Sequence, residues 1–251
     1  MSYTVQLNDN CVRVFLLQDC LALRGFLEGI DGSFGFDTEE AVKQFQSSEG
    51  LDIDGIVGSG TWGKLIEGRF PVPTTLPLDR SQVEFIFNNT IEPDQLSMLN
   101  GAMELFHITT PARIRHFLAQ IAHESAGLRY LEEIADGSDY EGREDLGNTE
   151  EGDGCRFKGI GPIQTTGRYG YQQLADYLGD QRIMEGCAYV RDNISPFVPS
   201  GFWWYDNDMN DLVDSGASCR EVSARVNGVD PANGLEERED YYAAACEVIF
   251  D

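Results

Sequence analysis

The sequence is poor in basic residues and has no long apolar run. Its 251 residues contain 18 Lys+Arg against 43 Asp+Glu, which gives a formal net charge of −25. A surface of this sign repels phosphate backbones, so we expect no nucleic-acid partner. No uninterrupted apolar run approaches the roughly 20 residues that span a bilayer, so we expect no membrane insertion.

Metal-binding patterns are also missing. The chain has only three histidines, and its six cysteines lie far apart without a C-x-x-C pair. These spacings exclude the usual zinc sites, and the sequence predicts neither a metal nor another cofactor. The cysteines are either buried thiols or form one or two disulfides, and the spacing does not decide between the two.

A proline-rich segment divides the chain. Residues 69–79 belong to the stretch GRFPVPTTLPLD, in which three prolines and two threonines interrupt the helical patterns on both sides. The sequence therefore predicts two domains, residues 1–68 and residues 80–251, joined by this linker.

The first domain contains an internal repeat. The patterns that begin at Asp31 and Asp54 both read Asp-Gly, two residues, Gly, two residues, Thr, and then a helix-like run. We expect each Asp to bond its own turn, and Thr38 and Thr61 to be helix N-caps.

A further helix is predicted before the repeat. Val14, Leu17 and Leu21 have helical spacing, and Gly25 ends the run. Together with the two repeats, this helix predicts a small three-helix bundle. In these features residues 12–67 resemble the three-helix peptidoglycan-binding domain found in many cell-wall hydrolases, which implies a wall glycan or stem peptide as ligand.

The second domain contains the stretch FLAQIAHESAGLRYLEE, residues 117–133. Thr110 and Pro111 predict a helix start before it, and Gly127 predicts its end. Its apolar stripe consists of Ile114, Phe117, Leu118, Ile121 and Ala122. Glu124 lies at the edge of this stripe, where partial desolvation favours the neutral form of a carboxyl, as a general acid requires. A structural carboxylate bonded to a backbone amide or an arginine is the alternative.

More carboxylates follow within seventeen residues, namely Glu132, Glu133, Asp136 and Glu141. Glycoside hydrolysis uses two carboxyl groups across the scissile bond, one protonated and one ionised. Downstream, residues 155–178 combine glycines with small polar side chains, which suits either a sugar site or turns before a helix.

These segments, with FWW and VNGVDPANGLEEREDYY, resemble the family 19 glycoside hydrolases, which include chitinases and lysozyme-type endolysins. The resemblance spans most of residues 80–245. It implies an α-helical lysozyme-like catalytic domain, a mainly α chain overall, and an inverting cleavage of β-1,4-linked N-acetylated amino sugars.

The resemblance also implies residue roles. Glu124 matches the general acid, Glu133 is favoured as the general base with Glu141 as the alternative, and Thr166 matches the residue that holds the attacking water. Glu132 is expected to face solvent. The predicted substrate contacts are His123, Gln164, Tyr171 and Asn227.

Two positions depart from the family pattern. Ile160 stands where the bacterial and phage branch of the family usually has arginine, and Gly170 stands where the family usually has asparagine. We expect the first to remove a charge near the site and the second to remove a sugar-contacting amide.

The resemblances leave three functions open: a peptidoglycan hydrolase, a chitinase, and a wall-binding protein without activity. The N-terminal domain favours the first. We expect a monomer that acts on the cell wall. Because the N-terminus shows no signal peptide, we expect it to leave the cytoplasm by phage-type or other non-classical release.

Overall fold

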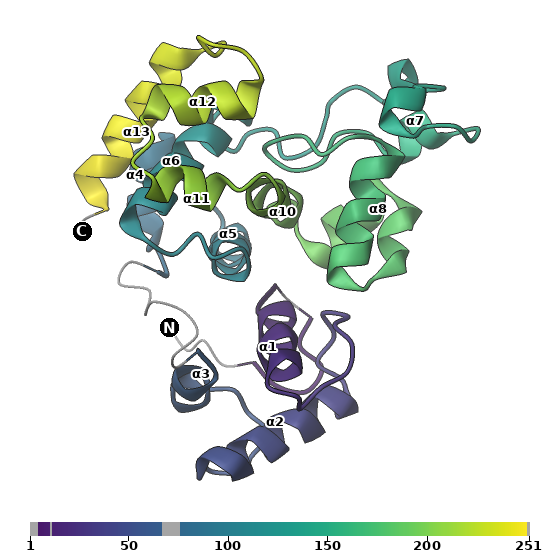
Figure 1. The fold of residues 1–251 in the computed structure, drawn as a ribbon, viewed down its shortest axis with the longest axis vertical. Helices are drawn as coiled ribbons and strands as arrows, with labels where there is room; N and C mark the ends of the chain where they lie inside the picture. Colours follow the sequence, from purple (N-terminus) through teal and green to yellow (C-terminus); the bar gives the residue numbers. More distant parts are fainter. Residues whose placement is uncertain (1–4, 11, 67–75, 250–251) are drawn as a thin grey trace.

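The computed structural model describes residues 5–10, 12–66 and 76–249 (Figure 1). Residues 69–75 of the predicted linker therefore lie outside the described residues. Within the described ranges the chain is mainly helical, and its only β pairing consists of isolated bridges. The predicted mainly α class is confirmed.

The N-terminal domain is a three-helix bundle, as predicted. Its helices are α1 (Val12–Leu23), α2 (Phe36–Glu49) and α3 (Ser59–Ile66). Their facing sides bury Leu17, Leu21, Val42, Phe45 and Leu65 completely. This apolar contact holds three short helices that would be marginal alone.

A buried glutamine organises the first copy of the repeat. The Gln18 side-chain amide donates to Asp31 Oδ1 (2.8 Å) and Thr38 Oγ1 (3.0 Å), and its carbonyl accepts from the Gly32 amide (2.7 Å). Asp31 also accepts from the Ser33 amide at 2.8 Å, so its predicted turn bond is confirmed. One side chain thus ties α1 to the turn and to α2.

The second copy is built in the same way. Gln46 donates to Asp54 (2.9 Å) and Thr61 (3.2 Å) and accepts from the Gly55 amide (2.9 Å). The predicted N-caps were wrong, because Thr38 and Thr61 are the third residues of α2 and α3 and are buried against the glutamines. The repeat therefore encodes two equivalent polar networks.

The second domain contains the remaining helices. They are α4 (Arg80–Phe87), α5 (Pro93–Leu105), α6 (Pro111–Glu124), α7 (Asp153–Arg156), α8 (Gly167–Leu178), α9 (Cys187–Tyr189), α10 (Val198–Asp206), α11 (Met209–Asp214), α12 (Cys219–Asn227) and α13 (Leu235–Val248). Short 3₁₀ and π turns lie at Ser138–Tyr140, Glu144–Leu146, Gln181–Glu185 and Val190–Ile194. In Figure 1, α7 and α8 lie on one side and α4, α6, α12 and α13 on the other.

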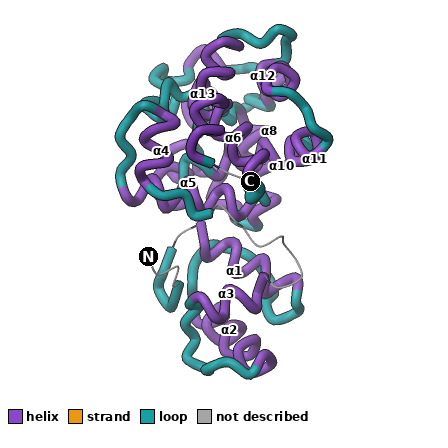
Figure 2. The backbone as a smooth tube through the Cα atoms, turned by 90° about the vertical axis from the view of Figure 1, so that its left-hand side faces the viewer, coloured by secondary structure: helices purple, strands orange, loops and turns teal. Residues whose placement is uncertain are grey.

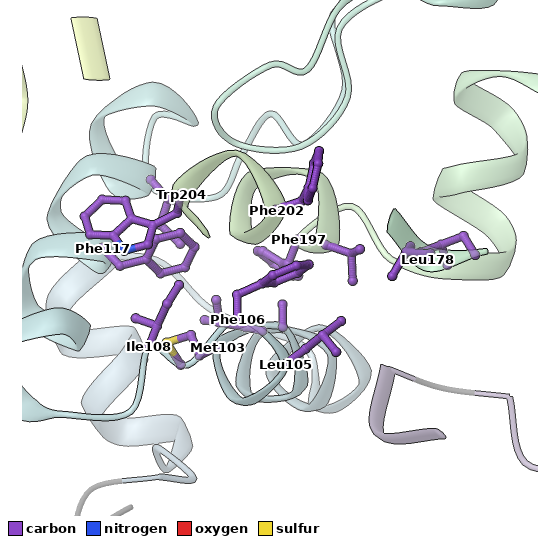
Figure 3. Close-up of a cluster of buried hydrophobic side chains, with 14 of the residues drawn as sticks. Met103, Leu105, Phe106, Ile108, Phe117, Leu178, Phe197, Phe202 and Trp204 are labelled. Carbon is purple, nitrogen blue, oxygen red and sulfur yellow. The ribbon is translucent and has the colours of Figure 1, made fainter. Parts of the chain in front are cut away.

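An aromatic cluster forms the centre of this domain (Figure 3). Phe117 of α6 meets Trp204 of α10 edge to face, with ring centroids 5.3 Å apart, and both side chains are fully buried. Phe106 and Phe197 extend the cluster under α10. The apolar stripe predicted on α6 therefore faces this core, which fixes the position of its last residue, Glu124.

The two domains are in contact. Helix α1 packs against α5, and the chain at Ile30 approaches Gly179 at the end of α8. Figures 1 and 2 both place the N-terminal bundle beside α5. The domain boundaries stay a prediction, and the two cores share apolar contacts across this junction.

Candidate active site

Glu124 is the last residue of α6, and its surroundings follow from how that helix begins and ends. Thr110 caps the first turn by accepting from the Arg113 amide, with Pro111 at the first helical position, as predicted. The helix ends three residues before the predicted Gly127. After it, Ala126, Gly127 and Leu128 have φ of 51°, 71° and 65°. This left-handed turn reverses the chain and leads it toward the next carboxylates.

A buried arginine holds Glu124. Arg238 of α13 is fully buried and donates to Glu124 Oε1, to Gln120 Oε1 (2.6 Å) and to the Asn233 carbonyl (3.1 Å). Gln120 and Glu124 are one turn apart on α6, so they present their oxygens to one guanidinium. The Glu124 side chain is 26% exposed and reaches the surface. Glu124 therefore pairs with a buried charge, and this is the arginine bond that the structural alternative for Glu124 predicted.

The two neighbouring predicted contacts, Asn227 and His123, have different partners. Asn227, half-buried at the end of α12, accepts from the Asn233 amide (2.8 Å), and the Asn233 carbonyl receives Arg238. His123 Nδ1 lies 2.6 Å from Glu237 Oε2. A Cβ on Gly234 would lie 2.1 Å from the His123 ring, so only glycine fits there.

Glu133 lies on an irregular segment and is held mainly by backbone. Its amide donates to the Gly159 carbonyl (2.9 Å), and the Gly159 amide donates back to Glu133 Oε2 (3.0 Å). The Tyr140 hydroxyl donates to Oε1 (2.8 Å). This hydrogen bond raises the pKa of Tyr140, so the hydroxyl stays a donor. Both oxygens of Glu133 are therefore oriented.

The predicted polar residues meet Glu133 across a glycine. A Cβ on Gly159 would lie 2.2 Å from Gln164 Oε1 and 3.1 Å from Glu133 Oε2, so these two side chains converge there. The side-chain amide of Gln164 donates to the Gly161 carbonyl (2.8 Å). The Thr166 hydroxyl donates to the main-chain carbonyl of Gln164 (2.9 Å). The structure thus places Glu133, Gln164 and Thr166 in one neighbourhood.

Glu141, the alternative base, is committed to the backbone. Its two oxygens accept from the Gly152 amide (2.7 Å) and the Gly154 amide (2.8 Å) at the start of α7. A carboxylate at this position satisfies free amides of a helix N-terminus. This role accounts for Glu141 without catalysis.

Glu132 is half-buried and does not simply face solvent as expected. It pairs with Lys158 (2.8 Å) and Arg191 (3.0 Å). Burial opposes ionisation of Glu132, but the bonds from these two cations outweigh burial and lower its pKa.

Tyr171, a predicted sugar contact, is fully buried, and its hydroxyl donates to the Lys158 carbonyl (2.7 Å). We therefore assign it to the core and not to the substrate surface. Tyr169, which sequence reasoning missed, is 60% exposed and packs beside Gly147. Buried Tyr171 lies on the apolar stripe of α8 with Leu174 and Leu178, and that spacing was readable in the sequence.

The two departures have different consequences. Ile160 is fully buried and bridges to Glu132 and Thr165, so its side chain belongs to the core beneath the site and not to a charged surface. Gly170 is half-buried, and a Cβ there would meet the Thr165 methyl group at 3.0 Å. A larger residue at Gly170 would therefore press on the loop that carries Gln164.

Several further features concern ligands. The described residues contain no cluster of three or more side chains suited to a metal ion. Within the described ranges, Cys155, Cys187, Cys219 and Cys246 are free thiols. Among the helices that the structure describes, none is long and apolar enough to cross a membrane.

Comparison with known proteins finds similarities in sequence. Residues 12–65 match the family of putative peptidoglycan binding domains. The chain is 27% identical over 160 residues to a glycosyl hydrolase family 19 domain-containing protein of Haemophilus influenzae, a match that covers 51% of this chain and 76% of that protein.

Solved structures show the fold of the second domain. Chitinase C of Streptomyces griseus superposes with a TM-score of 0.52 at 20% identity, covering 68% of this chain and 91% of that one. The class IV family 19 chitinase of Zea mays gives 0.51 at 18% identity, with the same coverage. The chain therefore joins a peptidoglycan-binding-type domain to a region homologous to family 19 glycosyl hydrolases.

Proposed function

We propose that this protein is a cell-wall glycan hydrolase that cleaves β-1,4 bonds of peptidoglycan with inversion at the anomeric carbon. One observation carries the proposal: two carboxylates on consecutive segments are oriented by different neighbours. Arg238 holds Glu124, while Tyr140 and Gly159 hold Glu133. Paired carboxyl groups in different surroundings can divide the acid and base roles.

The proposed chemistry gives each carboxylate one role. In the proposed step Glu124 delivers a proton from Oε2, the oxygen that Arg238 does not bind, to the glycosidic oxygen as the bond from that oxygen to the anomeric carbon breaks. A water attacks the anomeric carbon from the opposite face and gives its proton to Glu133. Thr166 and Gln164 position this water and the sugar beside Glu133.

Substrate contacts come from both sides of the site. On the Glu124 side we assign His123 and Asn227, and on the Glu133 side Gln164 and the exposed ring of Tyr169, which can stack on a sugar face. The backbone commitment of Glu141 supports Glu133 as the base.

The N-terminal domain supports peptidoglycan as the substrate, because its family is described as binding that polymer. Chitin is the second candidate, since the solved structures with this fold are named chitinases. Both polymers contain β-1,4-linked N-acetylated amino sugars, so the two functions share one mechanism.

Mass analysis of the released fragments tests both candidates. The protein is incubated with purified peptidoglycan and, separately, with chitin oligomers. We expect disaccharide-peptide fragments from peptidoglycan, with a newly formed reducing end of inverted configuration seen by proton NMR. Cleavage of chitin alone would assign the second candidate, and peptide fragments without glycan cleavage would refute both.

A further inference from the structure

Lys158 occupies a special position beneath the segment that carries Glu133. Its ammonium group is bonded to the Glu133 carbonyl (3.0 Å), the Ala135 carbonyl (3.4 Å) and Glu132 Oε1 (2.8 Å). The side chain is 18% exposed. All three donors of the ammonium group are therefore directed at residues 132–135.

The backbone of Lys158 is held as firmly as its side chain. Its carbonyl accepts the hydroxyl of fully buried Tyr171 (2.7 Å), and the next residue, Gly159, exchanges backbone and side-chain bonds with Glu133. A Cβ on Gly137 would lie 2.8 Å from the Lys158 Cβ, so the loop closes tightly over it. Lys158 thus connects the core of α8 to the Glu133 segment.

This arrangement compensates for a weakness in the local fold. Residues 130–137 form no helix. They pair with the segment around Ile160 through one isolated β-bridge, between Glu132 and Ile160. A single bridge constrains a loop weakly, whereas three bonds from one cation, two of them to main-chain carbonyls, fix its path.

We propose that Lys158 is a positioning residue for the general base: it sets the main-chain path at Glu133 and through it the place of the carboxylate. The inference rests on the proposed function, because it assigns Glu133 a catalytic role. Lys158 acts through Glu133 alone and does not contact the substrate.

Arg191 supplies a matched control. It pairs with the other oxygen of Glu132 at 3.0 Å, so it is a second cation on the same carboxylate. Its remaining bonds go to Asp192, and its side chain is 46% exposed. Arg191→Met therefore removes a charge near the segment without removing a bond to the Glu133 backbone.

Steady-state kinetics on a soluble glycan fragment test the proposal. We expect Lys158→Met to lower kcat by about 10- to 100-fold with KM changed less than about twofold, since a misplacement of about 1 Å has effects of this size. Lys158→Arg should recover most of the activity, and Arg191→Met should stay within about twofold of wild type.

A double variant separates positioning from a general structural effect. If Lys158 acts only through Glu133, then Lys158→Met should cause no further loss in a Glu133→Gln protein. Additive losses, or equal losses for Lys158→Met and Arg191→Met, would overturn the proposal.

Hydrogen exchange gives a readout that does not need activity. Lys158→Met should accelerate exchange of the Glu133 amide, which is bonded to Gly159, while the α6 amides exchange as in wild type. Unchanged exchange at Glu133 would refute the positioning role of Lys158, even if the protein cleaves no glycan. Faster exchange in a protein without glycan activity would support the contact between Lys158 and the Glu133 segment and would refute the proposed function instead.

Discussion

The two carboxylates of the site are held in contrasting ways. Glu124 ends a long helix and is held by the side chain of Arg238, which lies 114 residues further along the chain. Glu133 lies in an irregular segment and is held by the amide of Gly159, 26 residues away, and by the nearby Tyr140. The proposed acid thus depends on packing of α6 against α13, and the proposed base on a main-chain arrangement around Gly159. Variants of the residues around each carboxylate test this difference.

Removal of the acid should have the largest effect. Glu124→Gln keeps the size of the side chain and its bond to Arg238 but cannot deliver a proton. We expect turnover to fall by at least about 10²- to 10⁴-fold, with little change in substrate binding, as measured by steady-state kinetics. A folded Glu124→Gln protein with near wild-type activity would contradict the mechanism.

Glu133→Gln and Glu141→Gln should then separate. We expect Glu133→Gln to lose activity as severely as Glu124→Gln. Glu141→Gln should act mainly on stability, because its oxygens accept the amides of Gly152 and Gly154. Equal turnover losses in both variants would leave the base unassigned.

Loss of the buried arginine should affect stability strongly. Arg238→Met removes the partner of Glu124 and of Gln120 inside the α6–α13 contact, and breaking a buried pair of this kind costs about 3–5 kcal/mol. Urea unfolding measures this free energy. Arg143→Met, which removes an exposed pair with Asp145, is the control and should leave the unfolding curve unchanged. A small effect of Arg238→Met would show that side-chain pairing contributes little to the contact between α6 and α13.

The helix that carries Glu124 also contains a histidine, His116, that should lower the free energy of unfolding at low pH. His116 of α6 is 4% exposed, and burial lowers its pKa from 6.5 to about 4. It packs on the Tyr242 ring, and its Nδ1 has no hydrogen-bond partner. Between about pH 6.5 and pH 4, His116 is protonated in the unfolded chain but neutral in the folded chain. The free energy of unfolding therefore falls as the pH drops from 6.5 to about 4. The shift corresponds to about 3 kcal/mol.

His116→Phe is the test of this prediction. The variant lacks the titrating ring, so its unfolding free energy should fall less than that of wild type between pH 7 and pH 4. Urea titrations at several pH values measure the difference. Parallel pH dependences for the two proteins would rule out His116 as the cause.

Loss of the phenol on the base side should have the smallest effect. Tyr140→Phe removes one hydrogen bond to Glu133 and leaves the Gly159 amide in place. A hydrogen bond to a carboxylate contributes about 1.5–3 kcal/mol, so we expect a loss in kcat of about 10- to 100-fold at most. A loss as large as that of Glu133→Gln would mean that the phenol, and not the main chain, orients the base.

Features that depend on neighbours close in sequence were predictable. The N-cap at Thr110, the apolar stripe of α6 and the Asp turns at Asp31 and Asp54 all follow from residues within about seven positions of one another. The same reasoning failed at Thr38, because its hydroxyl was read as a local cap. Its partner is Gln18, twenty residues earlier. The residues next to Thr38 in the sequence do not indicate a bond to that distant amide.

The sequence by itself thus determined the helical class, which rests on residue type and short spacing, while the resemblance to family 19 glycoside hydrolases predicted the roles of the two carboxylates and of the polar residues that follow them. Only the tertiary structure decided which neighbours those groups meet. It paired Glu124 with Arg238, committed Glu141 to the amides of α7 and directed Lys158 at the Glu133 segment. The physical reason is that burial and charge pairing are set by elements that pack together from distant parts of the chain. The energy of a buried charge depends on those contacts and not on its neighbours in sequence.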